Sequence, residues 1–192
     1  MQRFSSMVAA WLVRANVIGE NDYELFYFAV YSLFFSLAPV ALAFAWGIAL
    51  SMIGESLLMI VPFVLIRKYS GGFHLKSAKH CFIVTTCLLG SSLLFTRWCI
   101  ELNRFTALSF AVVASTVVIC ICSPIDSEER LLTDTEQVRF RKIACCMALV
   151  MLAIYALFLI IGFERQFVPI GVGIVIVAVL QLPCIFKKVI CK

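Results

Sequence analysis

Long uninterrupted runs of apolar residues restrict this chain to very few folds. The clearest run is IGVGIVIVAVL at residues 170–180. Such a run satisfies its own backbone hydrogen bonds only as a helix, and the short alternation typical of transmembrane strands is absent. A helix needs about 20 apolar residues to cross a bilayer. The sequence therefore predicts an all-helical membrane bundle with six spans, at about residues 24–44, 47–66, 78–96, 105–122, 143–162 and 167–186.

The composition supports a membrane protein. Hydrophobic side chains make up 63% of the 192 residues and charged side chains only 14%, whereas soluble domains carry about 25% charged residues. Little sequence remains for a soluble domain, and no internal repeat or Pro/Gly/Ser-rich linker divides the chain. We therefore expect one domain over residues 1–192.

Residues 1–22 precede the first span and have the pattern of an amphipathic helix. Apolar residues fall at helical spacing on one face, and the two cations of this segment lie together on another. We expect this helix to lie on the inner leaflet of the membrane; the alternative is an extension packed against the bundle. The apolar face consists of Phe4, Met7, Val8, Trp11, Leu12 and Ala15, and the cations are Arg3 and Arg14.

The distribution of cations predicts the orientation. With six spans both termini lie on one side, and thirteen of the sixteen Lys and Arg residues then fall on that side. Arg97, Arg104 and Arg165 remain on the other. Cytoplasmic loops carry such an excess, so the N- and C-termini are predicted to be cytoplasmic, in contact with anionic lipid headgroups. The net charge of +5 therefore predicts no nucleic-acid partner, because no basic surface with interleaved aromatic residues accompanies it.

The nine cysteines do not form a metal-binding pattern. They are scattered through apolar stretches, no CxxC occurs, and the two histidines share one loop. We predict no metal and no cofactor, and interpret most cysteines as small hydrophobic side chains.

Glu55 is an acidic residue well inside a predicted span. It precedes the inner end of the span at Ile66 by eleven residues, or about 16 Å, which places it near the midplane. An intramembrane carboxylate is a functional candidate. A structural ion pair remains open, as does a hairpin turn near Gly54 that would put Glu55 at the outer surface.

The segment RKYSGGFHLKSAKHC at residues 67–81 holds most of the polar chemistry of the chain. A cysteine nucleophile needs a base or cation that maintains the thiolate, and His74 precedes Cys81 by seven residues. On one straight helix these two residues would be about 10.5 Å apart along the axis, too far for proton transfer. His80 would point about 100° away from Cys81 and is the weaker base candidate.

Two glycines provide the necessary break. Gly71 and Gly72 allow the segment to fold back over the start of the next helix, for which Ser77 is a candidate N-cap. Cys81 would then lie in the first turn, near the positive end of the helix dipole and beside Lys79. The sequence predicts a bent start of the third span, with His74 above Cys81. An inert loop of lipid-facing cations is the alternative.

The same segment resembles the signature of the accessory gene regulator B (AgrB-like) family, membrane cysteine endopeptidases of peptide quorum sensing. The family pattern R-x4-G-x-H-x6-C is met by Arg67, Gly72, His74 and Cys81. SPID after the fourth span and QLPCIFKK at the end of the sixth are similar to two further family segments, so that the resemblance covers nearly the whole chain.

The resemblance implies that Cys81 is the nucleophile and His74 the general base and acid in cleavage of an AgrD-type propeptide. It also implies that the acyl group passes to an internal thiol or hydroxyl, giving a cyclic thiolactone or lactone peptide. Arg67 would support the site, and physically it could bind an acidic propeptide or merely anchor the loop. The alternative function is a small-solute or peptide transporter that uses Glu55. Because so small a bundle encloses little space, we also expect a homodimer.

Overall fold

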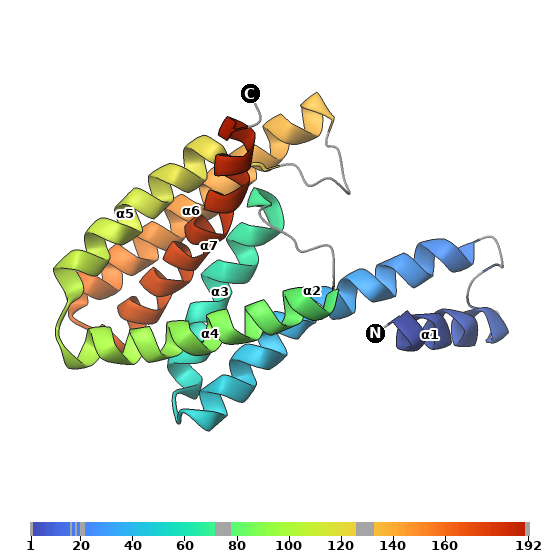
Figure 1. Ribbon diagram of the computed structural model, residues 1–192, viewed down its shortest axis with the longest axis horizontal. Helices are drawn as coiled ribbons and strands as arrows, with labels where there is room; N and C mark the ends of the chain where they lie inside the picture. The colour runs from blue at the N-terminus through green and yellow to red at the C-terminus, as the bar shows by residue number, and fades with distance from the viewer. Residues whose placement is uncertain are drawn as a thin grey trace. The chain divides into compact units, whose positions relative to one another are not determined.

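The computed structural model describes residues 2–15, 17, 19, 22–71, 78–125 and 133–190, and the regular elements in these ranges are all α-helices. The predicted all-helical fold is confirmed. The helices are α1 (Gln2–Arg14), α2 (Tyr23–Ala49), α3 (Ile53–Ser70), α4 (Ala78–Glu101), α5 (Phe105–Cys122), α6 (Asp134–Ile161) and α7 (Glu164–Ile190) (Figure 1).

The chain forms two compact units, Met1–Leu42 and Ala43–Lys192. In the first unit, α1 is the helix that the amphipathic pattern of residues 1–22 predicts, although it ends at Arg14. Met7 and Trp11 are both 64% exposed, while Ala9 is buried. Two residues of the predicted apolar face are thus exposed, and the placement of α1 on a membrane surface stays a prediction.

In the second unit, α7 is the central helix. It packs against α3, α4, α5 and α6, and 67% of its apolar stretch is buried, compared with 22–33% in α4, α5 and α6. Gly173 permits a close crossing with α3, because a Cβ atom there would collide with the backbone carbonyl oxygen of Met59. The core of this unit is thus built around the last helix of the chain.

Among the described residues, four helical stretches are long and apolar enough to cross a membrane: His80–Glu101, Phe105–Cys122, Thr135–Ile161 and Glu164–Cys184. They match the last four predicted spans, and the predicted bounds of residues 105–122 are those of α5. At α6 the helix begins earlier than the predicted span, because Thr133 and Glu136 form a capping box that starts it at Asp134.

The predicted span at residues 47–66 is wrong at its start. Helix α2 continues to Ala49, and the chain turns before α3 begins at Ile53. Ser51 takes a left-handed conformation with φ of 56°, and the Met52 amide donates a hydrogen bond to the Gly47 carbonyl over 2.8 Å. Glu55 therefore lies in the first turn of α3 and not in mid-helix. The turn between α2 and α3 thus lies at residues 50–52, slightly before the position near Gly54 that was the alternative.

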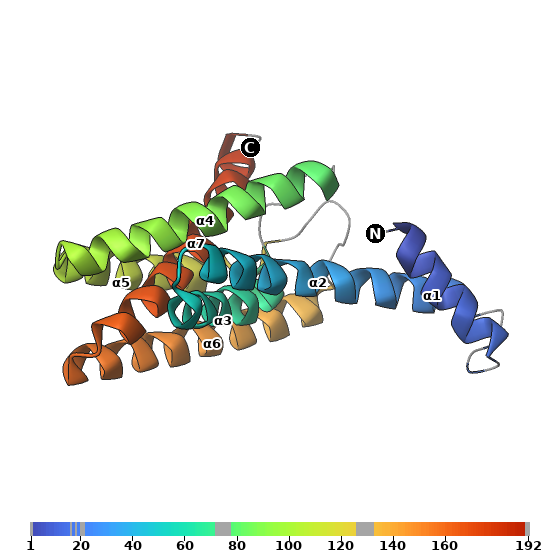
Figure 2. The same ribbon diagram turned by 90° about the horizontal axis from the view of Figure 1, so that it is seen from below.

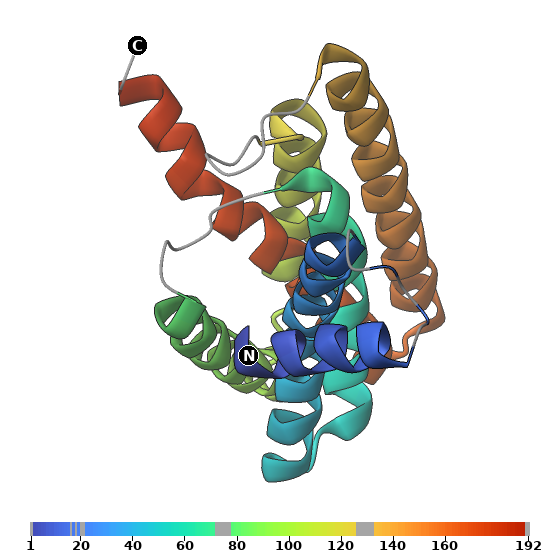
Figure 3. The same ribbon diagram turned by 90° about the vertical axis from the view of Figure 1, so that its right-hand side faces the viewer.

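One end of the second unit gathers the ends of several helices. The C-terminal ends of α3, α5 and α7 and the beginning of α6 all point towards this end (Figures 1 and 3). Helix α3 runs beside α6 (Figure 2), and Tyr69 contacts Phe140 edge to face with ring centroids 6.0 Å apart. The connection after α3 and the connection after α5, both predicted to be cytoplasmic, thus leave the bundle from the same end.

Candidate functional site

The chain is broken between α3 and α4, as the predicted site requires. Helix α3 ends at Ser70 and α4 begins at Ala78, so that no straight helix runs from Tyr69 to Cys81. The predicted helix start is confirmed, with Cys81 half-buried in the first turn of α4. His80 is exposed. Gly72, His74, Ser77 and the side chain of Lys79 lie outside the described residues, and their roles stay predictions.

Gly71 ends α3 in a conformation that suits glycine alone. Its φ of 69° and ψ of −154° fall in a region that side chains disfavour. Gly71 forms an isolated parallel bridge with Ile125, and the Ile125 amide donates a hydrogen bond to the Ser70 carbonyl over 3.0 Å. A Cβ atom on Gly71 would collide with the Ile125 carbonyl oxygen. The first residues after α5 are therefore held against the start of the segment that leads to Cys81.

Arg67 provides positive charge at this place. It is half-buried in the last turn of α3, and its guanidinium lies 6.0 Å from the centre of the Phe63 ring. Burial lowers the pKa of Arg67 from its ordinary value, while the charges of Cys81 and Cys184 raise it. Arginine keeps its charge in proteins at neutral pH. A positive charge therefore lies at the end of α3, where the segment that leads to Cys81 begins.

A polar contact joins α7 to the residue that follows α5, two positions before Ile125. The Gln181 side-chain amide donates a hydrogen bond to the Ser123 hydroxyl over 3.0 Å, and both residues are buried. Sequence reasoning missed this pair. The available signal was a single amide inside the apolar run AVLQLPC at residues 178–184, because a buried polar group needs a partner.

Glu55 lies at the opposite end of α3 from Arg67. It is half-buried in the first turn of α3, whereas Arg67 is in the last turn, twelve residues later and about 18 Å along the axis. The structure therefore separates Glu55 from Arg67 and Cys81.

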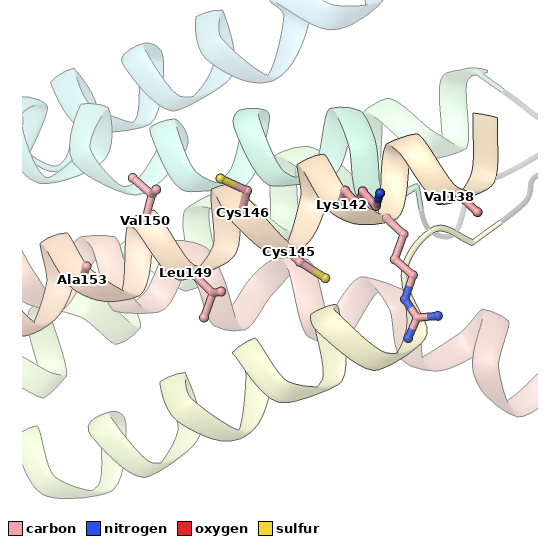
Figure 4. Close-up of a pocket in the computed structure, with 8 residues that line it drawn as sticks. Val138, Lys142, Cys145, Cys146, Leu149, Val150 and Ala153 are labelled. Carbon is pink, nitrogen blue, oxygen red and sulfur yellow. The ribbon is translucent and has the colours of Figure 1, made fainter. Parts of the chain in front are cut away.

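A surface cavity of about 800 Å³ lies along α6. Its walls come from α6 alone, which leaves it open along the helix (Figure 4). None of the predicted site residues lines it. The lining residues are Val138, Arg141, Lys142, Cys145, Cys146, Leu149, Val150 and Ala153.

Comparison with known proteins gives the family. No solved structure matches the chain. A curated protein of Clostridium perfringens (strain SM101 / Type A), whose name describes it as AgrB-like, is 25% identical over 143 residues. The match covers 68% of this chain and 66% of that protein, so the chain spans about two thirds of the relative's length. The family described as accessory gene regulator B matches residues 5–185. The chain therefore belongs to the accessory gene regulator B family, and its four long apolar helices agree with a membrane protein.

Proposed function

We propose that this protein is a membrane cysteine endopeptidase that matures an AgrD-type propeptide for quorum sensing. The observation that carries the proposal is the placement of Cys81. It lies in the first turn of α4, across a helix break from Gly71, and Arg67 lies in the last turn of α3, just before that break. A helix N-terminus and a nearby cation both favour a thiolate, the reactive form of a cysteine. Family membership supports the same assignment.

The reaction proceeds in two steps. The Cys81 thiolate attacks the scissile carbonyl carbon, the C–N bond breaks, and His74 gives a proton to the departing amine. The peptide is then joined to Cys81 as a thioester. A thiol or hydroxyl within the peptide attacks this thioester, His74 accepts its proton, and the Cys81 thiolate leaves. The product is a cyclic thiolactone or lactone peptide. A site at the membrane edge that limits water favours this transfer over hydrolysis.

The proposed topology retains six spans, with the site on the cytoplasmic side. Helix α2 has 27 residues, enough to cross a bilayer. Helix α3 has 18 residues, or about 27 Å. Its charged residues lie in its first and last turns, at Glu55 and at Arg67 and Lys68, where a spanning helix can carry them. With Glu55 in the first turn, no observation favours the alternative of a transporter.

The experiment is to express the protein together with the short open reading frame encoded beside its gene and to follow the mass of the peptide in membranes. Cys81→Ala and His74→Ala should each abolish cleavage. Matched controls are Cys87→Ala, six residues further along α4, and His80→Ala; both should retain most of it. Complete processing by Cys81→Ala protein would refute the assignment.

A further inference from the structure

The Gln181 carboxamide is fully buried, yet only half of it is paired within the described part of the chain. Its nitrogen donates to Ser123, whereas its oxygen Oε1 has no hydrogen-bond partner among the described residues. A buried acceptor without a partner lowers stability. Leucine, which needs no partner, would fit the apolar surroundings of α7 better. Stability alone therefore gives no reason for a glutamine at this position.

The bond to Ser123 leads directly to the proposed site. Ser123 follows the last residue of α5, and two residues later the Ile125 amide donates to the Ser70 carbonyl. Ile125 also bridges Gly71, where the segment towards Cys81 starts. A continuous series of hydrogen bonds and short backbone steps thus joins α7 to α5 and α5 to the end of α3.

We propose that Gln181 is a positioning residue of the cysteine site. Through Ser123 it fixes residues 123–125 against Ser70 and Gly71, and so fixes the start of the segment that leads to Cys81. This inference rests on the proposed function. Gln181 touches none of the reacting atoms, so its loss should disturb the geometry of the reaction more than the affinity for the peptide.

Gln181→Leu tests the inference, with the full chain in lipid nanodiscs and a synthetic peptide of the neighbouring open reading frame. We expect kcat to fall about tenfold with KM nearly unchanged, while the thermal midpoint stays equal or rises because the unpaired oxygen is gone. Ser123→Ala should lower kcat similarly. The double variant should be no worse than either single variant, because both changes break one bond. Gln181→Glu reverses the direction of the bond, since its carboxylate can accept from the Ser123 hydroxyl, and should keep most of the activity.

The matched control is Tyr155→Phe, which removes a 2.8 Å hydrogen bond to Ser109 between α5 and α6. Ser109 precedes Ser123 by fourteen residues, or about 21 Å, so kcat should not change. The inference is overturned if Gln181→Leu keeps the parent kcat, or if its activity falls only as its stability falls.

A second measurement separates this inference from the proposed function. Hydrogen exchange at the Ile125 amide should become about threefold to tenfold faster in Gln181→Leu protein, whether or not the parent chain cleaves the peptide. Unchanged exchange overturns the inference alone. Failure of the parent chain to cleave, together with faster exchange, overturns only the function.

Discussion

Replacing Gly71 with alanine should open the bridge between the two connections without unfolding the bundle. The backbone of Gly71, at φ 69° and ψ −154°, costs a residue with a Cβ atom about 1–3 kcal/mol. The new Cβ atom would also collide with the Ile125 carbonyl oxygen. The chain relieves both by giving up the bridge, in which the hydrogen bond from Ile125 to Ser70 contributes about 0.5–1.5 kcal/mol. Opening the bridge costs less free energy than unfolding the bundle. The strain should therefore appear as local opening between Gly71 and Ile125.

The measurement is hydrogen exchange of the peptide that contains Ile125, in parent and Gly71→Ala protein. A change of about 1–3 kcal/mol in local stability corresponds to about fivefold to 150-fold faster exchange, up to the rate of an unprotected amide. Exchange in the middle of α7 should stay the same, because α7 takes no part in the bridge. Cleavage should fall as well, since the segment that leads to Cys81 loses its fixed start.

Alanine substitutions at two other glycines serve as controls that distinguish backbone strain from collision of the new Cβ atom. Gly162 has φ of 84° but open space around it, and Gly54 has open space and ordinary helical geometry. Gly162→Ala should cost about 1–2 kcal/mol of stability and leave Ile125 exchange unchanged. Gly54→Ala should cost nothing, since alanine favours a helix. If Gly71→Ala protein exchanges at Ile125 like the parent, the reasoning about the bridge is refuted.

Three further changes test other parts of the structure. Thr133→Ala removes the capping box that begins α6 and should cost about 1 kcal/mol, seen as a lower thermal midpoint that Thr133→Ser restores. Trp46→Phe removes the 3.0 Å hydrogen bond from the indole to the Thr86 carbonyl and should cost about 0.5–1.5 kcal/mol in the same assay, with cleavage kept. Glu55→Gln should cost less than about 1 kcal/mol, because a carboxylate in a first helical turn is only modestly favourable. A tenfold loss of cleavage in that variant would instead indicate an essential carboxylate.

The helices that the sequence predicted best are those with clear signals at both ends. Helix α5 lies between Arg104 and the pair Ser123 and Pro124, and both of its bounds were correct. The turn before α3 carried no such signal. Leu50, Ser51 and Met52 include neither glycine nor proline, and Ser51 adopts its left-handed conformation within a stretch that has the hydropathy of a span. Composition alone could not locate that turn.

Sequence reasoning predicted only those features of the site that depend on residues close together in the chain. The break after Ser70 and the position of Cys81 follow from glycines and spacing within one segment. The bridge from Gly71 to Ile125 and the bond from Gln181 to Ser123 join residues more than fifty positions apart. Such contacts depend on how helices pack, and the pattern of a single sequence does not contain that information.

The central place of α7 has a consequence for biosynthesis. A membrane protein is inserted in the order of its synthesis, and α4, α5 and α6, which are long and apolar enough to cross a membrane, precede the helix that packs against all three of them. Until the ribosome has made α7, the earlier helices have lipid where the finished protein has its core, and Gly173 has not yet met Met59. A nascent chain that stops before residue 164 should thus be a loose set of helices, open to membrane proteases, and the last helix should complete the fold in one late step.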